Sequence, residues 1–261
     1  MMDFKTPSEL RLAIRAGSYQ APTPGLVPGY AQANLVVLPK ILAYDFLLFC
    51  QRNPKPCPVL EVTDIGNPEA YRSSPGSDLR FDIPKYRIYE YGELTGEVAD
   101  IKDYWQKDSV GFLIGCSFTF EKALSNAKVP IRHIECGCNV PMYKTNIPCV
   151  TAGMFSGNMV VSMRPIPNAQ IIRAVQVTSR YPSVHGAPIH IGDPGAIGIQ
   201  NLHETDFGDP VPINDGETPV FWACGVTPQL IAMVSKPPLM ITHAPGHMFV
   251  TDIWDETLAV I

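Results

Sequence analysis

The residues with the most reactive side chains lie in one stretch of the chain, from Arg132 to Pro165. This stretch combines three cysteines, a histidine, two arginines and a lysine with turn-forming residues. A segment that served only for packing would show longer apolar runs and fewer reactive groups. The pattern is typical of an enzyme pocket, and we expect short loops from the rest of the chain to converge on it.

The cations of this stretch favour an anionic ligand. An arginine such as Arg164 can hold a carboxylate through two parallel hydrogen bonds, and Lys144 adds a second positive charge. The alternative for such cations is a surface ion pair, which contributes little to stability. Neutral donors lie in the same turns. The residues predicted to bind a small carboxylate substrate are Ser117, Cys138, Asn139, Lys144, Thr145 and Arg164.

Two histidines, His243 and His247, flank a proline–glycine turn at the end of a predicted strand. Histidine suits proton transfer because its ordinary pKa lies close to neutrality. The alternative is that one or both side chains only hydrogen-bond to the turn, and we favour a functional role for at least one. His190, between two isoleucines, is expected to be half-buried and satisfied, while the role of His133 stays open.

An apolar run from Ser109 to Cys116 predicts a buried strand, and residues 118–126 predict a helix after it. Such a turn places backbone N–H groups at a helix N-terminus, where an anion can bind. Cys116 lies at the turn, where a lowered pKa would make it a thiolate, although most single cysteines are buried and inert. Asp193 follows another short strand. The predicted catalytic residues are His243, His247, Cys116 and Asp193.

Strands and helices alternate along most of the chain, which is predicted to be an α/β protein. Pro39 is expected to kink the longest helix. Strands are predicted at residues 56–62, 86–91, 109–116, 132–136, 149–155, 159–164, 188–192, 220–224 and 239–242. Helices are predicted at residues 6–17, 31–51, 118–126, 168–179 and 229–235.

Continuous apolar strands are typical of parallel sheets that are covered on both faces. Ligands in such sheets bind beyond the carboxyl ends of the strands, so the turns at Cys116, Asp193, Cys224 and His243 would become neighbours. Residues 121–186 break the rhythm and predict a smaller α+β domain. It would be inserted into a larger α/β domain made of residues 1–120 and 187–261.

Composition excludes several classes of function. The chain has 261 residues and a net charge of −5 without long runs of one sign, so a basic nucleic-acid surface is not expected. No apolar run approaches the ~20 residues that span a bilayer. Seven cysteines without an export signal predict reduced thiols in the cytoplasm. Only 17% of residues are charged, which is compatible with a homo-oligomer.

Metals and cofactors are not expected either. The spacing of Cys136 and Cys138 does not match a zinc site, and the turn between His243 and His247 prevents a regular helix that would pair them. The glycine-rich patterns that bind nucleotide phosphates are also missing from the sequence.

Seven segments, which together cover nearly the whole chain in order, resemble the D-glutamate cyclase family. They are TPGLVPGYAQANLVVLP, GFLIGCSFTFEKAL, CGCNVPMYKTNIPC, NMVVSMRPIP, HGAPIHIGDPGAIGI, FWACGVTPQ and ITHAPGHMFVTD. The resemblance implies a three-layer α/β/α domain with a smaller two-layer domain. It also implies a hydro-lyase that eliminates water from a small amino or hydroxy acid, above all one that converts D-glutamate to 5-oxo-D-proline. No established catalytic residues carry over.

That reaction gives each predicted residue a hypothetical role. Arg164 or Lys144 would hold the α-carboxylate, and a histidine of the His243/His247 pair would accept the ammonium proton. Cys116 with its turn amides, or an acid such as Asp193, would act on the γ-carboxyl group. Two alternatives stay open: a non-catalytic protein that binds small carboxylic acids, and an unrelated lyase for another small acid.

Overall fold

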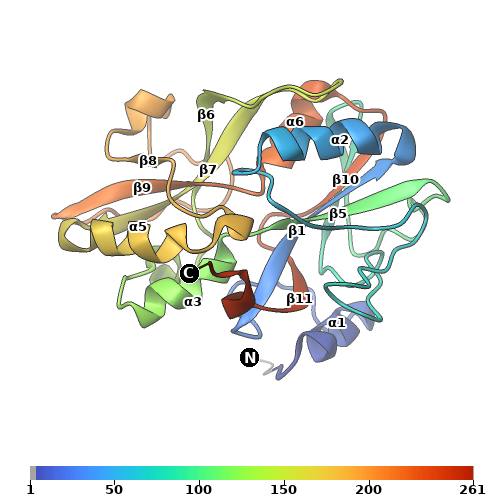
Figure 1. The fold of residues 1–261 in the computed structure, drawn as a ribbon, viewed down its shortest axis with the longest axis horizontal. Coiled ribbons are helices and arrows are strands. Elements are labelled where there is room, and N and C mark those ends of the chain that lie inside the picture. The colour runs from blue at the N-terminus through green and yellow to red at the C-terminus, as the bar shows by residue number, and fades with distance from the viewer. Residues whose placement is uncertain (1–3, 261) are drawn as a thin grey trace.

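A computed structural model describes residues 4–260 of the chain (Figure 1). The strands are β1 (Tyr30–Pro39), β2 (Val59–Val62), β3 (Tyr86–Glu90), β4 (Glu93–Val98), β5 (Ser109–Gly115), β6 (Met142–Pro148), β7 (Asn158–Pro167), β8 (His190–Ile191), β9 (Glu217–Ala223), β10 (Met240–His243) and β11 (Phe249–Trp254). The α-helices are α1 (Pro7–Arg15), α2 (Lys40–Arg52), α3 (Phe118–Asn126), α4 (Arg132–Cys136), α5 (Ile171–Ser179) and α6 (Thr227–Ser235).

The strands form two sheets, which lie side by side in Figure 1. The larger sheet has the order β2-β5-β1-β10-β3-β4, with β11 also paired to β1, and the smaller sheet has the order β6-β7-β9-β8. Each strand pair in the two sheets is antiparallel. The expected parallel pairing is therefore wrong.

The central strand β1 replaces the first half of the helix predicted at residues 31–51. All residues from Ala31 to Leu38 are buried, because β1 lies inside the sheet between β5 and β10. Successive side chains face opposite sides: Leu35 and Val37 join one apolar cluster, whereas Val36 and Leu38 join another. Pro39 therefore ends a strand and precedes α2, and it does not kink a helix.

The two faces of the larger sheet are covered by different kinds of structure. Helices α2 and α6 pack on one face, where they contribute Phe46, Phe49 and Ile231 to the core. Loop side chains, including Leu79 and Ile83, pack on the other face. Antiparallel strands covered on both faces produce the same apolar runs as parallel ones, which explains the wrong pairing prediction.

The smaller sheet carries α3 and α5 on one face, around Phe120 and Trp222. Residues 132–136, predicted as a strand, form the short helix α4. Strand β7 pairs with β6 and not with the strand predicted at residues 149–155, which has irregular backbone with one isolated bridge between Ala152 and Phe155. Most of the other predicted strands and helices are confirmed within a few residues.

Helices and sheets together confirm the α/β class. The smaller sheet takes β6 and β7 from residues 121–186, and it takes β8 and β9 from later in the chain. The layering and the domain boundaries stay predictions. Within residues 4–260, none of the helices combines the length and hydrophobicity needed to cross a bilayer.

Two strand–turn–helix units, β5 with α3 and β9 with α6, need small residues at their turns. A Cβ atom on Gly115 would lie 2.2 Å from the backbone oxygen of Ser183, and one on Gly225 would lie 1.9 Å from Asn34 Nδ2. Side chains at these positions would force the backbone apart. Gly115 therefore allows the close approach of Ser183 to the end of β5, and Gly225 allows the Asn34 side chain of β1 to approach the turn after β9.

Gly115→Ala is expected to destabilise the fold by about 1 to 3 kcal/mol, because the new methyl group meets backbone that cannot move aside. Gly111→Ala on the same strand is the matched control, since its methyl group would meet only side-chain atoms at 3.0 Å or more. Urea denaturation measures both variants. Equal stability of the two would contradict the close approach at Gly115.

Candidate active site

Three strand ends meet at a small cavity, which we call the inner cavity. Cys116 follows β5, Cys224 follows β9 and His243 ends β10, and all three residues line it. Its volume is about 20 Å³, which leaves room for about one water molecule. The other lining residues are Asn34, Ser117, Phe118, Asn139, Val140, Met142, Val226, Gly246 and Met248.

Two helices begin at the inner cavity. Helix α3 starts after Ser117 and α6 starts after Val226, and both residues line the cavity. Neither side chain caps its helix, but backbone carbonyls already accept from the first N–H groups. Thr119 N–H donates to Cys116 O, and the N–H groups of Thr227 and Gln229 donate to the carbonyls of Cys224 and Val226. Because a helix N-terminus carries partial positive charge, the cavity favours an anion or a developing negative charge.

The thiols of Cys116 and Cys224 hold their protons at neutral pH. Burial raises the pKa of Cys116 well above its ordinary value, and the backbone N–H of Phe118 lowers it only in part. Burial likewise raises the pKa of Cys224 to about 11. These shifts oppose the thiolate that the sequence predicted at Cys116, because burial outweighs the helix N-terminus. A neutral thiol can instead donate a proton.

His243 is a hydrogen-bond donor to the inner cavity. The backbone N–H of Leu35 donates to His243 Nδ1 at 3.2 Å, so the neutral ring carries its proton on Nε2. Burial lowers the pKa of His243 to about 3, which keeps the ring neutral. Nε2 is buried without a partner among the described residues. This tautomer gives His243 a donor role in place of the predicted base role.

Arg164 lies behind the cavity wall and is fully buried. Its guanidinium donates to Ser117 Oγ and Ser162 Oγ, both at 3.1 Å, and pairs with the carboxylate of Glu121. Although burial pushes the pKa of Glu121 upward, Arg164 and His133 outweigh that effect and lower it. Arg164 therefore positions Ser117, and the predicted contact with a substrate carboxylate is not available to it while this pair holds.

Of the other predicted residues, only Asn139 reaches the inner cavity. Lys144 is exposed and pairs with Asp206 at 3.2 Å. The buried Thr145 hydroxyl donates to the Met159 carbonyl, and the side chain of Asp193 accepts a hydrogen bond from Gly195 in an exposed turn. Cys138 is half-buried. The structure thus separates Cys138, Lys144, Thr145 and Asp193 from the cavity.

His247 lies in an adjoining groove together with Lys85 and Arg87. Its Nδ1 donates to the carbonyl of Pro245 at 3.0 Å, which is the turn-holding alternative weighed from the sequence. Burial lowers the pKa of His247. His243 therefore lines the inner cavity, whereas His247 lines the groove on the other side of the turn.

Two residues of the site were missed by sequence reasoning. Asn34 Nδ2 donates to the carbonyls of Ile114 and Gly115 at 3.2 and 2.8 Å, which ties β1 to the end of β5. The sequence signal that could have identified Asn34 was a single amide side chain within an apolar run. Glu121 gave no such signal, because a glutamate in a helix is usually solvated. In residues 4–260, no group of three or more potential ligands is placed to hold a metal ion.

The neutral state of His243 predicts that the free energy of unfolding depends on pH. Below the unfolded pKa of about 6.5 the unfolded chain takes up a proton at this ring and the folded chain does not, so stability falls as the pH drops. Wild type should lose roughly 2 to 3 kcal/mol relative to His243→Gln between pH 6.5 and 4.5. Urea denaturation at both pH values measures this, and a constant difference would contradict the buried neutral ring.

Comparison with known proteins places the chain in a family. Residues 110–252 match the model of the D-glutamate cyclase family. A protein of Geobacillus kaustophilus (strain HTA426), named "Putative hydro-lyase", is 66% identical over 100% of both chains. One of Bacillus subtilis (strain 168) with the same designation is 64% identical over 98% of this chain and 99% of its own. The chain belongs to the D-glutamate cyclase family, a family of hydro-lyase enzymes.

Proposed function

We propose that the chain is a hydro-lyase that converts D-glutamate to 5-oxo-D-proline and water at the inner cavity. The observation that carries the proposal is the convergence of two helix N-termini and the Nε2–H of His243 on one space. The family match and the names of the relatives support the reaction class.

Cyclisation develops negative charge at one oxygen. The amine nitrogen attacks the γ-carbon, a C–N bond forms, and the carbonyl electron pair moves to oxygen. His243 Nε2–H donates to that oxyanion, and the partial positive charge of the two helix N-termini stabilises it, as preorganised dipoles do in other acyl transfers. Holding nitrogen and carbon in one geometry supplies a further part of the acceleration.

The leaving oxygen must receive protons. Overall, the ammonium nitrogen loses two protons and the departing oxygen gains both, so the products are a lactam and water. The thiol of Cys116 is suited to donate one proton to the leaving oxygen and to regain one from nitrogen, since burial keeps it protonated. Asn139 offers an amide at the same cavity.

The inner cavity has to open for this substrate. A five-carbon amino acid does not fit into about 20 Å³. The cavity takes residues from both sheets, such as His243 from one and Met142 from the other. The proposal therefore includes the predicted three-layer domain with a smaller inserted domain, with the inner cavity between them.

His243→Ala is expected to lower kcat for D-glutamate by about 10² to 10³, because it removes one donor to the oxyanion. Formation of 5-oxoproline, followed by chromatography, is the measurement. Cys136→Ser is a matched control, since Cys136 is exposed and away from the inner cavity. Absence of 5-oxoproline with the wild-type protein would overturn the proposal and would favour a binding protein for small carboxylic acids.

A further inference from the structure

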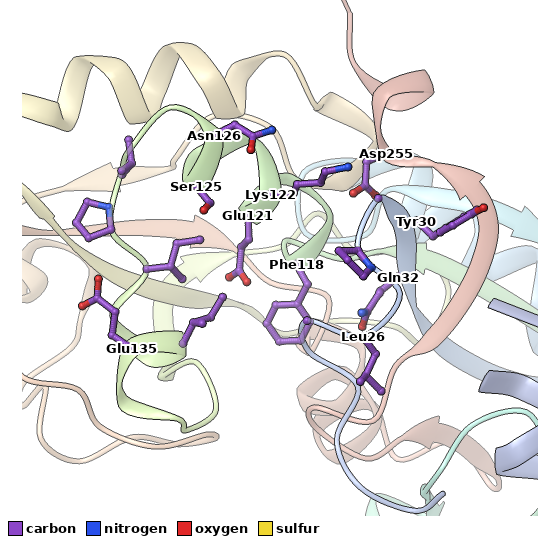
Figure 2. A pocket seen from close by; sticks show the side chains of 17 residues that line it. Leu26, Tyr30, Gln32, Phe118, Glu121, Lys122, Ser125, Asn126, Glu135 and Asp255 are labelled. Carbon is purple, nitrogen blue, oxygen red and sulfur yellow. The ribbon is translucent and has the colours of Figure 1, made fainter. Parts of the chain in front are cut away.

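A second and larger cavity, the outer pocket, is shown in Figure 2. It shares the lining residue Phe118 with the inner cavity. Its volume is about 400 Å³, which lies in the range of small-molecule sites. Its walls are the loop before β1, the first residues of β1, helix α3 and the segment from Val129 to Glu135. Most of its walls are apolar, and the polar groups include Gln32, Glu121, Lys122 and Asp255.

Asp255 is a buried residue whose carboxyl oxygen Oδ1 accepts no hydrogen bond from the described residues. It lines the outer pocket, its residue is only 5% exposed, and its Oδ1 has no hydrogen-bond partner within residues 4–260. Burial raises the pKa of Asp255 to about 7. An unpaired buried acceptor costs free energy, and a ligand that brings a positively charged donor would remove this cost.

Glu121 presents a second carboxylate to the same pocket. In Figure 2 its carboxylate points into the cavity. Its described partners, Arg164 and His133, both contact Oε1, which leaves Oε2 to the pocket. Arg164 and His133 lower the pKa of Glu121 despite its burial, so it stays ionised. The outer pocket thus offers two buried acceptors for a cation.

Phe118 is the side chain shared by the two cavities. It lines both the outer pocket and the inner cavity, and it is only half-buried. Figure 2 shows its ring beside the carboxylate of Glu121. A rotation of this ring would join a space of about 20 Å³ to one of about 400 Å³ without moving the sheets.

Cyclisation requires a proton acceptor for the ammonium group, and the outer pocket offers carboxylates that can accept a proton. The ammonium group must lose a proton before nitrogen can attack, yet His243 and the two thiols at the inner cavity are all proton donors. A carboxylate can bind an ammonium group and accept its proton. The acceptors lie in the outer pocket, on the other side of Phe118.

We infer that the outer pocket binds the ammonium group of an amino-acid substrate through Asp255 and Glu121, and that Phe118 turns aside so that the carboxyl end reaches the inner cavity. This inference rests on the proposed function for the substrate class. One proton passes from nitrogen to a carboxylate, and the nitrogen lone pair is then free to form the C–N bond. The carboxyl group later gives this proton to the leaving oxygen, and the second nitrogen proton reaches the same oxygen through Cys116, so that water departs.

Calorimetric titration with D-glutamate and glutarate at pH 8 tests the inference. The two molecules carry the same carboxylates and only D-glutamate carries the amine. Wild type should bind D-glutamate at least about tenfold more tightly than glutarate, and Asp255→Asn should abolish most of this preference. The matched control is Glu256→Gln, the same chemical change at an exposed neighbour outside the outer pocket, which should keep the preference.

Several outcomes would overturn the inference: no binding of either ligand, equal binding by wild type, or an unchanged preference in Asp255→Asn. Each protein in this comparison also carries His243→Ala, which slows turnover by about 10² to 10³, so failure of the preference is distinct from failure of the proposed function. If the protein forms no 5-oxoproline but loses its preference in Asp255→Asn, the proposed reaction is wrong and the ammonium site is upheld.

A second measurement uses the unmodified protein. Carbon NMR should show that D-glutamate lowers the pKa of Asp255 from about 7, whereas glutarate should not. Lys122 and Glu256 face Asp255 with opposite effects on its pKa. Burial is the main cause that raises the pKa of nearby Tyr181, and Asp255 adds to it. Those groups are the same with both ligands, so the difference reports the ammonium. Identical pKa values with both ligands would overturn the site.

The role of Phe118 has its own test. Trp254 stacks on Tyr30 at the outer pocket, with ring centroids 4.2 Å apart, and its fluorescence can follow binding in a stopped-flow instrument. Phe118→Ala should speed the association of D-glutamate severalfold, because the barrier between the cavities is gone. An association rate equal to that of wild type would overturn the gating role.

Discussion

The buried ion pair between Arg164 and Glu121 is the interaction on which the site depends. Arg164 lies on β7 of the smaller sheet, while Glu121 and Ser117 belong to the turn and helix that follow β5 of the larger sheet. The guanidinium also lies 5.5 Å from the rings of Phe120 and Trp222. Removing either charge would leave the other uncompensated, at about 3 to 5 kcal/mol. The pair therefore fixes Cys116 and Ser117 against the smaller sheet.

The two cavities beside this ion pair, the inner cavity and the outer pocket, differ in the polar groups that they offer a ligand. The inner cavity is narrow and lined with donors, because helix N-termini and a neutral histidine face it. The outer pocket is wide and holds acceptors, because Glu121 and Asp255 face it. Helix α3 contributes to both, with Phe118 between them. A molecule with a carboxyl group at one end and an ammonium group at the other matches this division.

Much of the fold could be predicted because its strand–turn–helix units are local. The apolar run before Cys116, the helix from Phe118 and the strand before Cys224 follow from short-range patterns. Strand β1 could not be predicted in this way, because Leu35, Leu38 and Leu42 have the spacing of a helix. Leu35 and Leu38 lie on β1, whereas Leu42 lies on α2. Strand direction depends on long-range pairing, which no local pattern encodes.

The candidate site was predictable only in part, for a related reason. Cys116, Ser117, Asn139 and His243 do meet, since each lies where an element ends beside the inner cavity. The partner of a charged side chain depends on the tertiary structure. Lys144 pairs with Asp206 and Arg164 pairs with Glu121, whereas both cations were expected to be free to bind a carboxylate. Burial likewise reversed the expected pKa shift of Cys116.

The most direct measurement is a crystal structure of the protein with bound 5-oxo-D-proline. We expect the lactam oxygen within hydrogen-bond distance of His243 Nε2, at the N-termini of α3 and α6, with the Phe118 ring turned away from its present position. A product molecule bound elsewhere, with His243 Nε2 still without a partner, would contradict the account.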